Sequence, residues 1–404
     1  MYYTQVTEQI VFDSFSKKYK SKDDVSKILH SLTVEQLGEL RVRYAQTRLD
    51  IIVTLTTRCD LHCAYCFENH IPRENMQLDV CIQVVEAIKT YIIEHGIERV
   101  DCVLFGGEPL LNKDVLEYFV SEMRKFCDDK NIRLNMLLTT NGVLFNPTEF
   151  SFLVKYGVTD VQVTFDGTEQ TNNRRRCSLD PKQNTYQAII NNFPAITACF
   201  EHVMVKFNFD LDNYNEYPMF LADLDNVLNA GPYKDRITII LETIHETPFA
   251  HYGHSFEMRG KNLAVKFVDL IRTTIDMGFN YVTKVFTTPC MHTSPNSFMI
   301  DTSGNAFSCI SAFGIPEFKL GSFMGKESLA LQNKRQRNNR ITTLKAHCSS
   351  CCYLPICWGG CAYLIKTEGK DIFTDVLCRR SYFDTVVKEF YKEITLKYGV
   401  NQIE

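Results

Sequence analysis

Residues 51–67 have the sequence IIVTLTTRCDLHCAYCF, which joins a strand-like segment to a group of potential metal ligands. The first part, residues 51–56, consists of β-branched residues and one leucine. Such a run is typical of a buried strand. Cys59, Cys63 and Cys66 follow directly. A loop that leaves a buried strand can wrap three thiolates around one metal centre, so we expect these cysteines to act together.

The same triplet has alternative interpretations as part of a zinc site or as buried thiols. Structural zinc takes four ligands, usually in paired Cys-x-x-Cys or Cys/His arrangements, and a lone triplet fits that pattern poorly. A [4Fe-4S] cluster normally takes four thiolates. Held by these three cysteines, it would have one iron without a local cysteine ligand. A small chelating molecule can occupy that position.

The overall composition argues against several classes of protein. The 404-residue chain has a formal net charge of -4, so it offers no general basic field for nucleic acid or an anionic membrane. No apolar stretch approaches the ~18 residues of a membrane span, and residues 1–5 lack the features of a signal peptide. We therefore expect a cytoplasmic protein. Its 16 cysteines then indicate metal binding rather than disulfides.

Strand-like runs alternate with amphipathic, helix-like segments over residues 51–241. This repetition predicts an α/β fold with a parallel sheet and right-handed crossovers. Six strands fall short of the eight of a closed barrel, so we expect a partial (β/α)6 TIM-type barrel. The predicted strands are 51–56, 100–105, 134–139, 161–165, 203–209 and 237–241. The predicted helices are 79–94, 114–127, 148–156, 185–197 and 217–229.

Polar and glycine-containing motifs follow three of these strands. They are Gly106-Gly107-Glu108-Pro109, Thr139-Thr140-Asn141-Gly142 and Thr164-Phe165-Asp166-Gly167. The carboxyl ends of parallel strands form one edge of a sheet, where active residues of such folds collect. Glycines permit close backbone approach, and a carboxylate such as that of Glu108 accepts hydrogen bonds from an ammonium group.

Together with the cysteine triplet, these motifs resemble the radical S-adenosylmethionine (radical SAM) superfamily. In that family the amino and carboxylate groups of S-adenosylmethionine chelate the open iron of the cluster. An electron from the cluster splits the sulfonium bond. The resulting 5'-deoxyadenosyl radical removes hydrogen from unactivated carbon.

The resemblance implies a set of residues that contact S-adenosylmethionine. The Gly-Gly-Glu-Pro motif would bind its amino group, Tyr65 and Phe67 would flank its adenine, and Arg176 would meet its carboxylate. Relatives often have His-Asp at positions 172–173, where this chain has Asn-Asn, and two further arginines adjoin Arg176. The complete set is Tyr65, Phe67, Gly106, Gly107, Glu108, Pro109, Asn141, Thr164, Asp166 and Arg176.

The C-terminal third carries a second cysteine pattern. Thirteen residues separate Cys290 from Gly304, four separate Gly304 from Cys309, and a later series follows the spacing C-x2-C-x5-C-x3-C-x16-C. These spacings match the seven-cysteine SPASM domain of radical SAM enzymes. By that resemblance, Cys348, Cys351, Cys357 and Cys378 hold one auxiliary iron-sulfur cluster, and Cys290, Cys309 and Cys361 contribute to another. Zinc is the alternative for these spacings taken alone.

The resemblance also predicts how the chain is divided. The parts are a short N-terminal helical segment (1–48), the partial barrel (49–250), a bridging helix (251–289), the SPASM domain (290–390) and a C-terminal tail (391–404). A hairpin turning at residues 303–305 should present Cys290 and Cys309 at its two ends. Residues 21–32 and 33–44 predict two short helices, a region smaller than the leader-binding module that peptide-modifying relatives often carry.

Radical SAM enzymes with SPASM domains mainly modify peptides or proteins. The first expectation is therefore a maturase for a ribosomally synthesised precursor peptide (a RiPP maturase) that forms a thioether or carbon–carbon crosslink. Its partners would be the precursor peptide and an external electron donor such as ferredoxin or flavodoxin.

The second expectation is an anaerobic sulfatase-maturating enzyme, which forms formylglycine. In that group an aspartate base follows the cysteine equivalent to Cys309, where this chain has Ile310. The third is a non-catalytic iron-sulfur or zinc protein.

The first auxiliary site lacks one cysteine that sulfatase-maturing relatives have. They supply it shortly before the equivalent of Cys290, but this chain has no cysteine between Cys199 and Cys290. Cys352, His292 or an oxygen ligand would complete the site, or one iron would stay open. An open iron would bind a substrate thiolate, which favours thioether formation.

Overall fold

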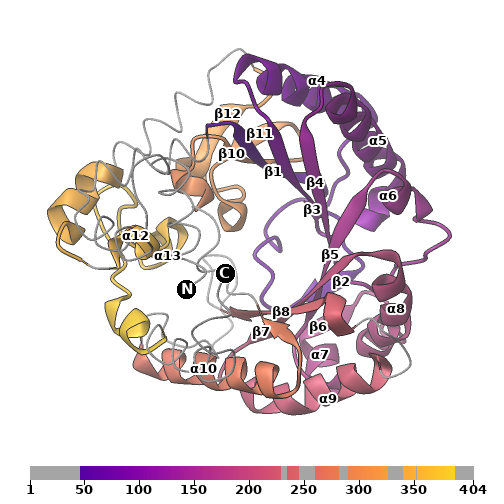
Figure 1. Ribbon diagram of the computed structural model, residues 1–404, viewed down its shortest axis with the longest axis vertical. Helices are drawn as coiled ribbons and strands as arrows, with labels where there is room; N and C mark the ends of the chain where they lie inside the picture. Colours follow the sequence, from indigo (N-terminus) through magenta and orange to yellow (C-terminus); the bar gives the residue numbers. More distant parts are fainter. Residues whose placement is uncertain are drawn as a thin grey trace, which may run out of the picture.

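A curved and mostly parallel sheet forms the centre of the protein. A computed structural model describes residues 46–228, 234–244, 260–281, 290–325, 340–351 and 353–386. In these ranges the main sheet has ten strands in the order β12-β11-β10-β1-β3-β4-β5-β7-β8-β9. Helices α4, α5, α6, α8, α9 and α10 lie along its outer side, and the C-terminal helices α12 and α13 lie across the ring from α5 and α6 (Figure 1). In the described ranges the two edge strands, β12 and β9, do not pair with each other, so the barrel is open as predicted.

The six predicted strands are all present and all parallel. They pair in chain order, and each is as long as predicted or slightly longer. Their bounds are β1 (Arg48–Thr56), β3 (Arg99–Gly106), β4 (Arg133–Thr140), β5 (Val158–Phe165), β7 (His202–Phe209) and β8 (Ile237–Thr243). Two short strands of a separate sheet, β2 (Leu61–Cys63) and β6 (Arg176–Ser178), were not predicted.

Most of the predicted helices are also present. They are α4 (Leu78–Glu94), α5 (Lys113–Asp129), α8 (Thr185–Cys199), α9 (Tyr217–Leu228) and, within the predicted bridge, α10 (Lys261–Asp276). The prediction over 148–156 was wrong in extent, because α6 covers only Ser151–Lys155. The Asn146 side chain accepts hydrogen bonds from the N–H groups of Thr148 and Glu149, so a turn replaces the first helical turn.

The alternating strand pattern separates an outer core from an inner face. In β7, Val203, Val205 and Phe207 are buried, whereas the alternate residues Met204 and Lys206 are half-buried. The outer set packs against the helices. Phe220 of α9, for example, lies 5.1 Å from the ring centroid of Phe207. Such aromatic pairs contribute about 0.5–1.5 kcal/mol beyond the burial of their area. The inner face is therefore free for a ligand site.

The predicted hairpin in the C-terminal region extends the same sheet. β10 (Ser297–Ile300) and β11 (Asn305–Phe307) are antiparallel, and Gly304 in their turn has a φ of +78°. β10 also pairs in parallel with β1, and β12 (Lys319–Ser322) continues the edge. On the opposite edge, the two-residue β9 (Asn280–Tyr281) pairs with β8. The C-terminal cysteine region is thus anchored beside the strand that leads into the cysteine triplet.

Several predicted segments lie outside the described residues. These are the N-terminal helices at 21–32 and 33–44, the tail at 391–404, the parts of the bridge at 251–259 and 282–289, and Cys352. The predicted division of the chain into its parts stays a prediction. Among the helices that the structure describes, none combines the length and the apolar character needed to cross a membrane.

Candidate active site

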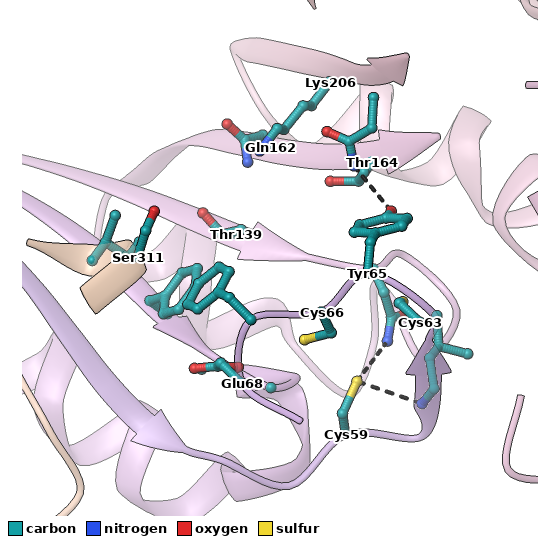
Figure 2. A pocket seen from close by; sticks show the side chains of 18 of the residues that line it. Cys59, Cys63, Tyr65, Cys66, Glu68, Thr139, Gln162, Thr164, Lys206 and Ser311 are labelled. Carbon is teal, nitrogen blue, oxygen red and sulfur yellow. Dashed lines mark hydrogen bonds between the residues drawn. The ribbon is translucent and has the colours of Figure 1, made fainter. Parts of the chain in front are cut away.

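A cavity of about 460 Å³ lies at the carboxyl ends of the central strands. The N-terminal cysteines and the residues that follow several strands line it, and Ile310, Ser311 and Tyr363 of the C-terminal region complete its wall (Figure 2). Most of the residues predicted from the sequence are brought together there. They are Cys59, Cys63, Tyr65, Cys66, Phe67, Gly106, Gly107, Asn141, Thr164 and Arg176.

The cysteine loop is held by a short pair of strands. β2 pairs antiparallel with β6, which sets Cys63 opposite Arg176. The N–H of Ala64 donates to the carbonyl oxygen of Arg175 (2.9 Å). Within the loop, the N–H of Cys66 donates to the carbonyl oxygen of Cys63 (3.1 Å). This pairing explains why the cysteines and Arg176, far apart in the sequence, share one cavity.

The electrostatic state of the three thiols fits an iron-sulfur cluster. Burial raises the pKa of Cys59 and of Cys63 to about 12, and that of Cys66 to about 11. Thiols with such pKa values are protonated near neutral pH, and coordination to a metal would deprotonate them. The donor set therefore suits a [4Fe-4S] cluster. Among the described residues no group of His, Cys, Asp and Glu side chains has the arrangement for a metal ion, so ligation stays a prediction.

Gly106 and Gly107 are required by the close approach of the cysteine loop. A Cβ on Gly106 would lie 2.1 Å from the carbonyl oxygen of Thr56, and one on Gly107 would lie 2.3 Å from that of Arg58. The N–H groups of Gly107 and Glu108 donate to these same two oxygens, at 2.9 and 2.8 Å. The predicted close backbone approach is confirmed. In the structure, the neighbour that comes close is the start of the cysteine loop.

Glu108 is fully buried behind the cavity wall and does not line it. Its Oε2 accepts from the N–H of Asn141 (2.7 Å), and both carboxylate oxygens lie within 3.0 Å of the Thr140 hydroxyl. Burial raises the pKa of Glu108 to about 7, while these donors favour its charged form. Pro109, also outside the lining, begins the short helix η1 (Pro109–Asn112). The predicted contacts of both residues with the cofactor stay predictions, and in the structure Glu108 joins the ends of β3 and β4.

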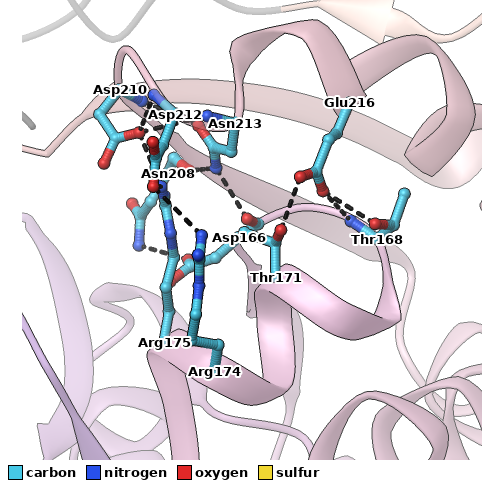
Figure 3. Close-up of polar contacts among 10 residues, drawn as sticks. All are labelled: Asp166, Thr168, Thr171, Arg174, Arg175, Asn208, Asp210, Asp212, Asn213 and Glu216. Carbon is cyan, nitrogen blue, oxygen red and sulfur yellow. Dashed lines mark hydrogen bonds and ion pairs between the residues drawn. The ribbon is translucent and has the colours of Figure 1, made fainter.

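Three consecutive arginines after β5 have three different surroundings, and Figure 3 shows those of Arg174 and Arg175. Arg174 pairs with Asp212 at the surface, and the fully buried Arg175 donates from Nη2 to Oδ1 of Asp210 (2.7 Å). Arg176 lines the cavity and donates to the hydroxyl of Tyr65 (3.3 Å). The short helix α7 (Glu169–Arg175) produces this separation. Arg174 and Arg175 therefore do not crowd the cavity.

Asp166 lies one layer behind the position expected for it. It is fully buried and does not line the cavity. Its Oδ1 accepts from Nδ2 of Asn208 (3.2 Å), which also donates to the hydroxyl of Tyr65 (3.0 Å). Asn213 donates to the backbone carbonyl of Asp166 (2.7 Å) (Figure 3). Asp166 thus supports the side chains that line the cavity.

The seven C-terminal cysteines fall into two sets of neighbouring thiols. Burial raises the pKa of Cys309, and the thiols of Cys361 and Cys290 raise it further. Burial likewise raises the pKa of Cys348 to about 11, with further increases from Cys357, Cys351 and Cys378. These sets have the same members as the two groups that the family resemblance implied, and their binding of clusters stays a prediction. Of the candidate extra ligands, His292 is buried and its Nδ1 is 3.1 Å from the Ser308 hydroxyl.

A buried arginine connects these two sets. Arg340 donates to the carbonyl oxygens of Asp375 and Gly359, both at 2.7 Å, and in the described ranges it has no carboxylate partner. A Cβ on Gly359, whose φ is +76°, would lie 2.7 Å from Nη2 of Arg340. Burial lowers the pKa of Arg340, whereas the thiols of both sets raise it. A buried cation of this kind needs a nearby negative charge, which metal-bound thiolates supply.

Some cavity residues were missed from the sequence. Gln162, Lys206 and Glu242 lie on the inner faces of β5, β7 and β8 and line the cavity. A charged residue inside an otherwise apolar strand, such as Lys206 in HVMVKFNF, is the signal that points to them. Ser311 and Tyr363 carry no such signal, because their position depends on how the C-terminal region meets the sheet.

Comparisons with known proteins agree with this site. Residues 53–210 match the family model described as the Radical SAM superfamily, and they extend from β1 to the end of β7. These residues therefore form a radical SAM domain, the domain of enzymes of that class. Enzymes of this class use S-adenosylmethionine and a [4Fe-4S] cluster. The match therefore does not support the alternative of a non-catalytic iron-sulfur or zinc protein.

Two relatives differ in how much of the chain they match. The radical SAM cyclopropyl synthase TigE of Paramaledivibacter caminithermalis is 24% identical over 210 residues, which is 46% of this chain and 43% of TigE. This chain thus spans less than half the length of TigE. A cysteine-type anaerobic sulfatase-maturating enzyme of Clostridium perfringens is 21% identical over 368 residues, or 85% of this chain and 95% of the relative.

Two solved structures share the fold. One is native anSMEcpe with bound AdoMet and the Kp18Cys peptide, with a TM-score of 0.66 and 16% identity over 87% of this chain and 98% of that one. The other is Streptococcus suis SuiB bound to the precursor peptide SuiA, with a TM-score of 0.59 and 13% identity over 90% of this chain and 82% of that one. At these identities the likeness shows a common fold.

We expect Glu108→Gln to destabilise the protein by about 1–3 kcal/mol, the cost of leaving a buried hydrogen-bonding group unsatisfied. The new amide NH2 would face N–H groups that now donate to a carboxylate oxygen. Urea unfolding monitored by circular dichroism measures the change. Glu94→Gln, at an exposed position at the end of α4, is the matched control. Equal stability of the two variants would contradict the role given to Glu108.

Proposed function

We propose that this protein is a radical SAM peptide maturase that generates a 5'-deoxyadenosyl radical and installs a crosslink in a ribosomally synthesised precursor peptide. The crosslink is a thioether or a carbon–carbon bond. One observation carries the proposal: the cysteine triplet, Arg176 and residues of the C-terminal cysteine region line the same cavity. Radical chemistry and a large substrate are both accommodated by such a site.

Different residues that line the cavity have different proposed roles. Cys59, Cys63 and Cys66 would hold the [4Fe-4S] cluster, which together with S-adenosylmethionine supplies the radical when bound. The guanidinium of Arg176 attracts the carboxylate of that cofactor. Phe67 adds an apolar surface, and its ring lies 6.4 Å from that of Phe105 in a stacked arrangement. Apolar walls exclude water, which limits side reactions of a radical.

The C-terminal cysteines would hold two auxiliary iron-sulfur clusters. The two sets of neighbouring thiols support this assignment, as does the buried charge of Arg340 between them. An external donor such as ferredoxin or flavodoxin would deliver electrons. The likeness to SuiB bound to its precursor peptide, and to anSMEcpe with a bound peptide, supports a peptide substrate.

Sulfatase maturation is the alternative function. It is favoured by the match to the Clostridium perfringens enzyme over 95% of that enzyme's length. The cavity argues against it at one position, because Ile310 lines the wall where that group would supply an aspartate base. An isoleucine cannot accept a proton. Crosslink formation therefore remains the first choice.

Replacement of the cysteine triplet tests the radical chemistry. We expect Cys59→Ala, Cys63→Ala or Cys66→Ala to abolish the formation of 5'-deoxyadenosine under reducing conditions, because each removes a cluster ligand. Iron bound by the C-terminal cysteines should remain. Chromatography of the reaction products and iron analysis measure the two effects. Cys199→Ala, at the end of α8, is the control that should keep both. Cleavage activity in any triplet variant would overturn the proposal.

The choice between the two functions has a separate test. We expect no formylglycine when the reconstituted protein is incubated with a cysteine peptide derived from a sulfatase, because position 310 offers no base. Mass spectrometry of the peptide detects the loss of mass on conversion of a thiol to an aldehyde. That loss would favour the alternative while leaving radical SAM chemistry intact.

Arg340 provides a test of the auxiliary clusters. In a background lacking the cysteine triplet, we expect Arg340→Gln to retain less iron than the parent after exposure to a chelator. The reason is that the variant loses the buried positive charge near both thiolate sets. Arg340→Lys should retain an intermediate amount, and Lys319→Gln, an exposed change in β12, should behave like the parent. Equal retention by Arg340→Gln and the parent would contradict this role.

A further inference from the structure

The inner face of the sheet gives the cavity an apolar side and a polar side. β1, β3 and β4 contribute Ile52, Val103 and Leu137, whereas β5, β7 and β8 contribute Gln162, Lys206 and Glu242. Figure 2 shows Gln162, Thr164 and Lys206 on the wall that faces the cysteine loop across the cavity. The charged groups are thus separated from the predicted cluster by the space that ligands would fill.

Lys206 is exceptional among the half-buried lysines of the described ranges. Each of the others has a partner: Lys89, Lys113, Lys234 and Lys366 pair with carboxylates, and Lys266 donates to the hydroxyl of Tyr214. Lys206 has neither an ion pair nor a hydrogen bond within the described part of the chain. An ammonium group held in a cavity without a partner is a ready site for a carboxylate.

Glu242 supplies the opposite charge from the adjacent strand. It is half-buried, lines the same cavity and, among the described residues, has no hydrogen-bond or ion-pair partner. In the strand register, Lys206 lies opposite Ile240 and Glu242 lies opposite Asn208. The two charges are therefore offset by two positions along neighbouring strands. They present one cationic and one anionic group to a ligand between them.

The charged groups of S-adenosylmethionine do not account for this pair. Under the proposed function, its amino and carboxylate groups are bound at the cluster and beside Arg176, on the cysteine side of the cavity. The remaining ligand is the substrate. In an extended peptide, side chains two residues apart lie on the same side and roughly 6.6 Å apart, from a rise of about 3.3 Å per residue. Lys206 and Glu242 are offset by two positions along strands that lie a further ~4.8 Å apart, a separation that the flexible ends of long charged side chains on such a peptide can span.

We propose that Lys206 and Glu242 form a charge-selective substrate subsite, which binds a peptide segment carrying an acidic and a basic side chain two positions apart. Lys206 binds the acidic side chain and Glu242 the basic one. The proposal rests on the peptide maturase function proposed above and names the class of peptide that it takes. The contacts are specificity-determining, since neither residue is required for the cleavage of S-adenosylmethionine.

A peptide library tests the subsite directly. Nonapeptides with a central cysteine and random flanking residues are incubated with the reconstituted full chain and S-adenosylmethionine, and the retained peptides are sequenced by mass spectrometry. We expect the wild-type protein to enrich, in one order, segments that carry an acidic and a basic side chain two positions apart, by about tenfold or more, the effect of one charge-assisted hydrogen bond. Lys206→Met should lose only the acidic preference, and Glu242→Gln only the basic one.

Exchange of the two charges is the decisive variant. Lys206→Glu combined with Glu242→Lys should enrich the order opposite to that of the wild type, because the subsite is inverted. Lys113→Met, which alters a half-buried lysine remote from the cavity lining, is the control and should keep the wild-type preference. A variant that fails to fold would lose the wild-type preference, but it would not gain the reversed one.

The outcomes separate this inference from the proposed function. Identical enrichment by the wild type and the Lys206 and Glu242 variants, or no peptide retained while S-adenosylmethionine is still cleaved, would overturn the subsite. Weaker S-adenosylmethionine binding by Lys206→Met, measured by equilibrium dialysis, would also overturn it, because Lys206 would then hold the cofactor. Failure of the wild type to cleave S-adenosylmethionine would instead overturn the proposed function.

Discussion

The close contact between the Gly106-Gly107 backbone and the end of β1 is the constraint on which the site depends. The carbonyl oxygens of Thr56 and Arg58 occupy the space where side chains at 106 and 107 would begin. Their hydrogen bonds to Gly107 and Glu108 fix the direction in which the chain leaves β1. The cysteine loop starts at that point. A larger residue at either position would displace the loop and, with it, the three thiols.

From this contact the support for the cavity extends outward through buried polar groups. Glu108 connects the loop after β3 to Thr140 and Asn141 at the end of β4. Asn141 in turn donates to Asp60 in the cysteine loop (2.6 Å). Because these groups are buried, each hydrogen bond that is made avoids an unsatisfied polar atom, so the network favours one arrangement of the loop. The rigidity of the site thus comes in part from Glu108 and Asp60, which do not line the cavity.

The sequence predicted the strands and the cysteine groups better than it predicted individual roles. Runs such as 203–209 carry a local signal, because their alternation and β-branched residues depend on neighbours in the chain. The pairing of β2 with β6 involves three residues on each side and has no such signal. The separate fates of Arg174, Arg175 and Arg176 depend on Asp210 and Asp212, which are distant in sequence. Likewise, the burial of Glu108 and Asp166 is a property of the whole sheet.

The two faces of each central strand explain how one sheet serves both stability and substrate selection. The outer face buries residues such as Phe207 against the helices, and its sequence is constrained by close packing. The inner face contacts a ligand space instead, so a polar or charged residue there costs little while the cavity holds solvent or a charged partner. Lys206 is thus tolerated between two buried neighbours in β7. Changes on the inner face can alter which ligand the cavity accepts without altering the fold, which is how one fold supports different functions.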